Sequence, residues 1–166
     1  KKISRRDFIK TTAAAGGAAA LMPQTIFSSQ NKKNMRIGFI GTGLRGQWML
    51  WLATKYPDVE IPAICDIDDG MISAALKIIK DSGREEPKVY KKNDEDFRNL
   101  VKNEDLDGVY IATPWEWHHP MAIAAMKAGI HVGTEVPAAL TVNECWDLVN
   151  VSEKTGKFCM IMENVC

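Results

Sequence analysis

Short apolar runs alternate with amphipathic segments along most of this chain. Residues 36–41 form an apolar run that ends at glycine, which is typical of a buried strand in a parallel sheet. Residues 44–55 follow with helical spacing, and Trp48, Trp51 and Leu52 are expected to share one face of that helix. The pattern therefore predicts a strand followed by a helix as its first unit.

The second unit repeats this order. Residues 59–65 are apolar but contain Pro62, which indicates an irregular or edge-like strand. Asp68 and Asp69 are suited to cap the helix that follows, and this helix is expected to end before Gly83. Its apolar stripe is formed by Ile72, Ala75, Leu76 and Ile79.

The alternation continues to the end of the chain. The further expected strands are 89–90, 108–112, 131–133 and 158–162, and the further expected helices are 94–102, 121–128 and 142–155. Residues 113–120 are expected to form a loop. One side of the last helix is expected to hold Cys145, Leu148, Val149 and Ser152. Six strands alternating with helices predict an α/β fold, a Rossmann-type doubly wound parallel sheet.

Residues 1–30 differ in composition from the rest of the chain. A basic start containing Arg5 and Arg6 precedes an uncharged stretch of alanine and glycine, which is too short and too weakly apolar for a stable membrane span. The string around the two arginines resembles the twin-arginine export signal of bacteria; the alternative is a basic terminus without a targeting role. We expect a signal segment and linker in 1–30 and a folded domain in 35–166.

Composition and charge narrow the range of partners. Of 166 residues, 46% are hydrophobic and 25% are charged, which excludes a disordered tail. Lys and Arg number 21, as do Asp and Glu, so the zero formal charge predicts no general attraction to nucleic acid or membranes. The four cysteines form no C-x-x-C pair, so no zinc or redox motif is indicated, and most thiols are expected to be buried.

A glycine-rich motif lies between the first expected strand and helix. Gly41, Gly43 and Gly46 form G-x-G-x-x-G, which permits a tight turn, close approach of a pyrophosphate and packing of the helix on the sheet. The helix N-terminus then faces the phosphates. Asp66 lies twenty residues after Gly46, where a carboxylate can accept hydrogen bonds from an adenosine ribose and repel a 2′-phosphate. These residues predict NAD rather than NADP; the alternative is a glycine turn with a surface aspartate.

The segments after the later strands contain candidates for contacts to the rest of the cofactor, because open α/β sheets bind ligands outside the carboxyl ends of their strands. Trp115 and Trp117 are suited to pack against nicotinamide or ribose, or alternatively to bury area at a domain interface. Glu116 and His118 are suited to hydrogen-bond hydroxyls or to move protons. Glu135 is placed to orient a ribose or a substrate, with a solvated loop glutamate as the alternative.

The histidines do not indicate a metal site. His118 and His119 lack the further ligands that a metal needs, so no metal is predicted. His131 precedes an expected strand and is expected to have a structural role.

Together these features resemble a known family. The order of Gly41–Gly46, Asp66, Thr113-Pro114-x-x-x-His118 and Glu135-x-Pro137 is similar to that in the dinucleotide-binding domain of the Gfo/Idh/MocA oxidoreductase-like superfamily. The strings at 115–118, 135–136, 144–150 and 160–166 are most similar to glycoside hydrolase family 109, whose members are NAD-dependent α-N-acetylgalactosaminidases. Val136 stands where many dehydrogenases of the superfamily have a lysine that assists proton transfer, which disfavours a simple dehydrogenase.

The resemblance implies a redox-assisted hydrolysis. In this reaction NAD⁺ takes hydride from C3 of a terminal sugar, a base removes the C2 proton as the C1 group leaves, water adds, and hydride returns to C3. The resemblance also implies a second α/β domain absent from this chain, with the catalytic residues beyond Cys166 and with His118 and Glu135 as helpers. The cofactor contacts that it implies are Leu44, Arg45, Asp66, Trp115, Glu116, Trp117, His118, Glu135, Val136 and Asn164.

The implied substrate is a glycan ending in N-acetylgalactosamine, or a similar glycoside, and residues 1–166 alone are not expected to hydrolyse it. The twin-arginine route carries folded proteins, so we expect a periplasmic or cell-surface enzyme that retains and regenerates its NAD. Two alternatives stay open: a periplasmic NAD-dependent sugar or polyol dehydrogenase, and a non-catalytic NAD-binding domain.

Overall fold

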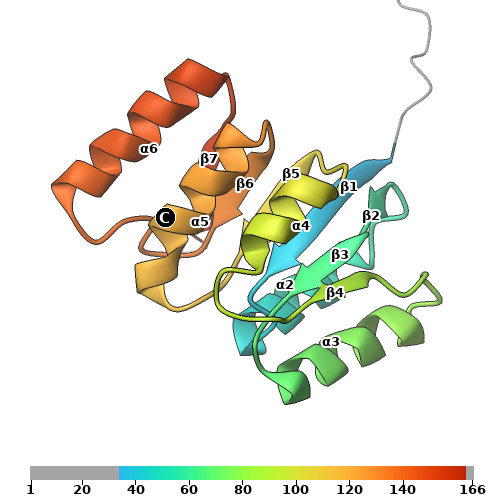
Figure 1. Ribbon diagram of the computed structural model, residues 1–166. Coiled ribbons are helices and arrows are strands. Elements are labelled where there is room, and N and C mark those ends of the chain that lie inside the picture. The colour runs from blue at the N-terminus through green and yellow to red at the C-terminus, as the bar shows by residue number, and fades with distance from the viewer. Residues whose placement is uncertain (1–33, 164–166) are drawn as a thin grey trace, which may run out of the picture. The chain divides into compact units, whose positions relative to one another are not determined.

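The computed structural model describes residues 34–163, whose strands form one parallel sheet. The strands are β1 (Met35–Ile40), β2 (Val59–Glu60), β3 (Ala63–Cys65), β4 (Lys88–Tyr90), β5 (Gly108–Ile111), β6 (His131–Thr134) and β7 (Cys159–Ile161). They are arranged in the order β4-β3-β1-β5-β6-β7, and β2 pairs with the first residues of β1 (Figure 1). Because every pairing is parallel, the prediction of a Rossmann-type sheet is confirmed.

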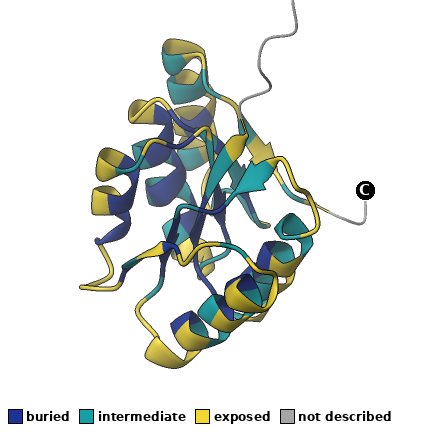
Figure 2. Cartoon of the chain, turned by 90° about the vertical axis from the view of Figure 1, so that its right-hand side faces the viewer, coloured by how far each residue is buried: buried dark blue, intermediate teal, exposed yellow. Residues whose placement is uncertain are grey.

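Helices cover both faces of the sheet. They are α2 (Leu44–Ala53), α3 (Asp69–Asp81), α4 (Phe97–Asn103), α5 (Trp115–Lys127) and α6 (Val142–Thr155). The first two pack together on one face, and the other three cover the opposite face (Figure 1). Buried residues lie along the strands and on the inward sides of the helices, as Figure 2 shows. The sheet is therefore doubly wound, as the alternation predicts.

The strands at the centre of the sheet position the site. The last residues of β1 pair on one side with β3, through Phe39 and Ile64, and on the other side with β5, through Phe39 and Tyr110. The helix that follows β1 and the helix that follows β5 pack on opposite faces of the sheet. Their divergence opens a crevice at the carboxyl ends of these two strands, which is where doubly wound sheets bind ligands.

Local signals account for several helix boundaries. Asp68 caps α3, and its side chain accepts a hydrogen bond from the Met71 N–H. Thr141 and Glu144 form a reciprocal capping box at the start of α6, which ends at Gly156 in the left-handed conformation. Sequence signals of this kind act within one turn of the chain, so they are visible before any tertiary contact is known.

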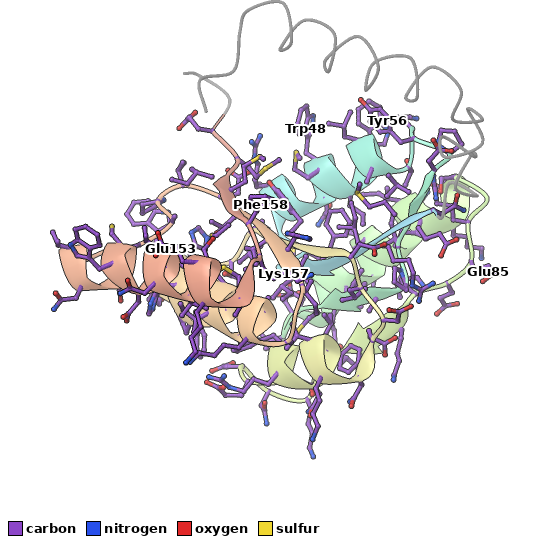
Figure 3. The ribbon with its side chains drawn as sticks, turned by 90° about the horizontal axis from the view of Figure 1, so that it is seen from above. Trp48, Tyr56, Glu85, Glu153, Lys157 and Phe158 are labelled. Carbon is purple, nitrogen blue, oxygen red and sulfur yellow. The ribbon has the colours of Figure 1, made fainter. Side chains whose placement is uncertain are left out.

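The two tryptophans of α2 lie outside the core. The side chains of Trp48 and Trp51 are 51% and 45% exposed, and Leu50 is the fully buried apolar side chain of this helix. Figure 3 shows Trp48 and Tyr56 projecting from the outer side of this part of the chain. Because α2 is apolar on two sides, spacing alone cannot tell which side packs against the sheet.

Two helix boundaries differ from the expected ones. Helix α4 begins at Phe97, after the expected start at 94. Helix α5 begins at Trp115, although residues 113–120 were expected to be a loop, and Pro120 lies inside it. At this sixth helical position the proline removes one main-chain hydrogen bond and crowds the carbonyl four residues earlier, but burial of Met121, Ala122 and Ala125 holds the helix on the sheet. The expected order of strands and helices is unchanged by either shift.

Other expectations have mixed outcomes. Pro62 separates two short strands, β2 and β3, as an irregular run predicts, so the described sheet has seven strands where six were expected. His131 has the structural role expected of it, because its ring stacks on Phe158 at 5.3 Å and its Nδ1 accepts the Phe158 N–H. The expectation that most thiols are buried is wrong for the described residues: Cys65 is buried, Cys159 is half-buried and Cys145 is exposed.

Some expectations fall outside the described residues. The signal segment and linker in 1–30, Asn164 and Cys166 are among them. Within residues 34–163, no helix has the length and apolar character needed to cross a membrane.

Candidate functional site

A cleft of about 330 Å³ lies at the carboxyl ends of β1, β3 and β5. The glycine-rich turn forms one wall, Asp66 and Met71 form another, and Thr113, Pro114 and Trp117 close the third. We refer to this cleft as the first cleft. It occupies the crevice between the two windings of the sheet, where the topology predicts a ligand.

The three glycines of the turn have three different surroundings. Gly41 has a φ of 88°, and a Cβ there would lie 2.5 Å from the Ala112 carbonyl oxygen, so only glycine fits. A Cβ on Gly46 would collide with the Gly41 carbonyl oxygen, which explains how α2 packs so closely on the turn. A Cβ on Gly43 would meet no atom within 4 Å. The middle glycine therefore faces open space, as a phosphate-binding turn requires.

The N-terminus of α2 points at this space. Gly43 is the N-cap residue, makes no side-chain capping bond, and is followed by no acidic residue in the first turn. The first N–H groups of the helix thus have no capping side chain from the N-cap residue, and their partial positive charge favours an anion. The turn itself is held from behind, because Gln47 Nε2 donates to the Thr42 carbonyl at 2.8 Å.

Asp66 joins the end of β3 to the glycine-rich turn. Its Oδ2 accepts hydrogen bonds from the Thr42 N–H at 2.5 Å and from the Thr42 hydroxyl at 3.0 Å. Its Oδ1 accepts the N–H groups of Ile67 and Asp68 at 2.7 and 3.0 Å. The carboxylate is thereby fixed at the edge of the first cleft, and its contact with an adenosine ribose stays a prediction.

The charges around the first cleft bear on cofactor choice. Asp66 and Asp94 line it, and no lysine or arginine is among its described lining residues. Two carboxylates without a basic partner would repel a phosphate on the adenosine ribose. The lining thus favours a dinucleotide whose adenosine ribose is not phosphorylated.

A second cleft of about 190 Å³ lies at the ends of β5 and β6. Its lining includes Arg45, Trp115, His118, Glu135 and Val136, all of which the sequence singles out. The Glu135 side chain is 13% exposed, and its Oε1 accepts a hydrogen bond from Arg45 Nε at 2.7 Å. This ion pair joins the first turn of α2 to the segment that follows β6.

Tyr110 adds a second donor to the same carboxylate. Its hydroxyl, buried beneath the crevice on β5, donates to Glu135 Oε1. Burial raises the pKa of the Tyr110 phenol well above its ordinary value, and the Glu135 carboxylate adds to that effect. The hydrogen bond to Glu135 likewise raises the pKa of the Arg45 guanidinium. Both groups therefore keep their protons and act as donors.

His118 is in the expected place but is already engaged. It is fully buried, with Nδ1 2.7 Å from the Pro137 carbonyl oxygen and Nε2 2.8 Å from the Thr113 carbonyl oxygen. Both ring nitrogens thus face main-chain oxygens, and the side chain joins the segment after β5 to the segment after β6. This arrangement supports a positioning role and corrects the expectation of a ring nitrogen free to bind hydroxyls or move protons.

The remaining predicted residues are divided between the two clefts and the surface. Trp117 packs edge-on against Phe97 at 6.1 Å and lines the first cleft, whereas Trp115 is 62% exposed and lines the second. The side chains of Leu44 and Glu116 are exposed and line neither cleft. Contacts from these two residues to a cofactor stay a prediction, as does the contact from Asn164.

Sequence reasoning missed several residues of the two clefts. Asn93 and Asp94 come three and four residues after the end of β4, whereas Asp66 directly follows β3, and polar residues soon after a strand were the available signal. Thr42 was hidden because its role depends on Asp66, 24 residues away. Among the described residues, no group of three or more His, Cys, Asp or Glu side chains could hold a metal ion.

The family follows from a comparison with known families. The model of the Gfo/Idh/MocA oxidoreductase family, described as having an NAD-binding Rossmann fold, matches residues 35–163. The chain belongs to this family. A second model, of the twin-arginine translocation signal sequence, matches residues 2–22.

Curated relatives are similar over almost the whole chain. A glycosyl hydrolase family 109 protein of Parabacteroides distasonis is 48% identical over 98% of this chain and 38% of its own length. An alpha-N-acetylgalactosaminidase of Tannerella forsythia is 47% identical over 98% of this chain and 39% of its own length. The chain therefore spans less than two fifths of these relatives.

Solved structures of two inositol dehydrogenases share the fold. The myo-inositol 2-dehydrogenase of Lactobacillus plantarum superposes with a TM-score of 0.65 at 27% identity, over 78% of this chain and 36% of that one. The scyllo-inositol dehydrogenase of Lactobacillus casei, solved with NAD(H) and scyllo-inositol, superposes with a TM-score of 0.67 at 23% identity. The match covers 78% of this chain and 36% of that one. At this identity the second likeness supports the fold alone.

Proposed function

We propose that the full-length protein is an NAD-dependent glycosidase that removes terminal α-N-acetylgalactosamine or a closely similar sugar. The observation that carries the proposal is the open face of Gly43 at the N-terminus of α2, with the Asp66 carboxylate fixed beside it. The names and identities of the family 109 relatives support the glycosidase part.

The residues of the clefts fit NAD. The open side of Gly43 and the first turn of α2 would hold the diphosphate. Asp66 would accept a hydroxyl of the adenosine ribose in place of the Thr42 hydroxyl. The second cleft, with Glu135 and Val136, would receive the nicotinamide half. A phosphate on the adenosine ribose would face two carboxylates, so we propose NAD rather than NADP.

When bound, NAD supplies a hydride acceptor that is restored within each turnover. The protein's part is to orient hydroxyl groups next to the cofactor and to provide no acid–base group for a simple dehydrogenation at position 136. Glu135 can accept a hydrogen bond from a hydroxyl and so fix a sugar ring next to the cofactor. Val136 carries no proton that it could donate or accept, so this position does not provide the acid–base group on which a simple dehydrogenase would rely.

We also propose export in the folded state, to the periplasm or the cell surface. The match of residues 2–22 to the twin-arginine signal supports this. A cofactor that is regenerated in every cycle suits a compartment where fresh NAD is scarce, because the enzyme then consumes none.

The test uses the full-length protein and 4-nitrophenyl α-N-acetylgalactosaminide. We expect nitrophenol release without accumulation of NADH, and one deuterium at C2 of the released sugar when the reaction runs in D₂O, because the C2 proton is exchanged. Heat denaturation should release NAD. Stoichiometric NADH would favour the dehydrogenase instead, and neither activity together with tight NAD binding would favour the non-catalytic domain.

A further inference from the structure

Three side chains from distant parts of the chain meet at one oxygen atom. Glu135 Oε1 accepts hydrogen bonds from Arg45 Nε, at 2.7 Å, and from the Tyr110 hydroxyl. Arg45 lies in the first turn of α2, Tyr110 lies on β5, and Glu135 directly follows β6. The pairing of Ile111 with Thr134 brings the ends of β5 and β6 together, so the carboxylate lies above the tyrosine.

The other oxygen of this carboxylate is left for a different partner. No described residue from 34 to 163 donates a hydrogen bond to Glu135 Oε2, although the side chain is mostly buried and lines the second cleft. Two donors on Oε1 restrict rotation of the carboxylate, because turning it would break both bonds. The geometry therefore leaves one acceptor, in a fixed direction, for a ligand in the second cleft.

Each donor is itself held in place. The Tyr110 ring packs on Phe39 at 5.7 Å, and on its other side Gly133 occupies the paired position on β6 without a side chain. The Arg45 guanidinium lies 5.3 Å from the ring centre of Trp48. The carboxylate is thus supported by a rigid strand from below and by α2 from the side.

Resting on the function proposed above, we propose that Tyr110 and Arg45 are positioning residues that direct Glu135 Oε2 toward a hydroxyl of a sugar ring. That ring is either the ribose on the nicotinamide side of NAD or the sugar of the glycoside, since both present hydroxyl donors. Arg45 also ties this carboxylate to the turn that would hold the diphosphate, so the two ends of the cofactor site share one support.

The chain contains a matched control of the same chemistry. Tyr90 is also buried, its hydroxyl donates to Glu104 Oε1, and Lys88 Nζ pairs with that same oxygen at 2.9 Å. None of these three side chains lines either cleft. Tyr90→Phe therefore removes an equivalent hydrogen bond without touching the site.

The experiment measures binding of AMP, ADP-ribose and NAD to the full-length protein. AMP reports on the adenosine half, and ADP-ribose adds the second ribose without nicotinamide. If Oε2 binds the ribose of NAD, Tyr110→Phe should lower the affinities for ADP-ribose and NAD about tenfold and leave the affinity for AMP unchanged. In a Glu135→Gln background, Tyr110→Phe should cause no further loss of affinity. Tyr90→Phe should leave all three affinities unchanged.

The second source of the hydroxyl gives a different pattern. If Oε2 binds the glycoside, Tyr110→Phe should leave all three nucleotide affinities unchanged and raise KM for the nitrophenyl glycoside about tenfold, and Glu135→Gln should do the same. The positioning role is overturned if Tyr110→Phe weakens AMP binding as much as NAD binding. It is also overturned if Tyr110→Phe lowers the thermal stability as much as Tyr90→Phe and changes neither the nucleotide affinities nor KM.

The binding measurements also separate this proposal from the function on which it rests. Selective loss of ADP-ribose and NAD binding in a protein that hydrolyses no glycoside would refute the glycosidase and support the positioning role. A wild-type protein that binds neither ADP-ribose nor NAD and has no glycosidase activity would overturn both.

Discussion

The Thr42 N–H and the Asp66 carboxylate share a 2.5 Å hydrogen bond that ties the glycine-rich turn to the end of the neighbouring strand. The Thr42 hydroxyl reinforces it by donating to the same oxygen. The residue that is proposed to bind the adenosine ribose is therefore also a support of the proposed diphosphate site. A substitution of Asp66 should therefore affect both the proposed ribose contact and the proposed diphosphate site.

Asp66→Asn should weaken NAD binding at least about tenfold and narrow the preference for NAD over NADP. An amide keeps the shape but loses the negative charge. Its single acceptor oxygen cannot serve both Thr42 and the N–H groups of Ile67 and Asp68. Titration of both nucleotides by calorimetry measures the two effects. Asp69→Asn, at an exposed ion pair with Lys91, is the control. An unchanged NAD affinity would remove Asp66 from the site.

Gly43→Ala and Gly41→Ala should separate binding from folding. At Gly43 the φ is −64° and a Cβ meets nothing within 4 Å, so the variant should lose only about 1 kcal/mol or less of stability. Its methyl group should nevertheless fill the space proposed for the diphosphate and abolish NAD binding. At Gly41 the positive φ and the contact with the Ala112 oxygen should cost at least about 2 kcal/mol.

Urea unfolding and NAD titration of the two variants provide the measurements. Gly43→Ala that binds NAD as tightly as the wild type would show that the diphosphate does not lie on this turn. Gly41→Ala that is as stable as the wild type would contradict the tight contact with Ala112.

Acid should destabilise the fold through two carboxyl groups. Hydrogen bonds from Tyr90 and Lys88 lower the pKa of Glu104 below its ordinary 4.5, and those from Asn99 and the Lys92 N–H lower the pKa of Asp96 below 3.8. Since the pKa of each group is lower in the folded than in the unfolded protein, each carboxylate stabilises the fold above its ordinary pKa. This stabilisation is lost as the pH falls through the folded pKa. The midpoint temperature of thermal unfolding should therefore decrease as the pH is lowered below about 4.5.

Glu104→Gln checks the assignment. This variant should be less stable than the wild type at neutral pH, and it should lose less stability between pH 5 and pH 3, because the group that binds the proton is gone. Equal acid sensitivity in the two proteins would exclude Glu104 as a contributor.

The cysteines should differ in reactivity toward iodoacetamide. Burial raises the pKa of the Cys65 thiol to about 12 and that of Cys159 to about 11, and the thiolate is the reactive form. Cys145 is exposed, so it should be labelled first among these three. Mass spectrometry of peptides after timed labelling measures the order, with denatured protein as the control. Rapid labelling of native Cys65 would contradict its burial.

The order of strands and helices could be predicted because its signals are local. Glycine ends the first strand, Asp68 caps α3, and Gly156 ends α6, each within one turn of the element concerned. The start of α5 is not predictable in this way, because Pro120 indicates a helix break, whereas in the structure the helix begins at Trp115 and Pro120 lies in its second turn.

The clefts were only partly predictable. Gly43 and Asp66 belong to a motif with fixed spacing, so their place at the crevice was accessible from the chain alone. Tyr110 carried no such signal, since its contact with Glu135 depends on the register between β5 and β6. His118 showed the reverse difficulty: its position was predicted, but the carbonyl groups of Thr113 and Pro137 that engage its ring depend on the tertiary structure.

Among the described strands, the first in the chain lies in the middle of the sheet. β1 needs β5 on one side, and Ile37 pairs with Gly108, 71 positions further along. During translation the apolar face of β1 must stay without its main partner until that segment emerges from the ribosome, because loop closure over such a length precedes any gain from pairing. If the protein leaves the cell interior already folded, as we propose, the joining of these two strands decides when it is ready to leave.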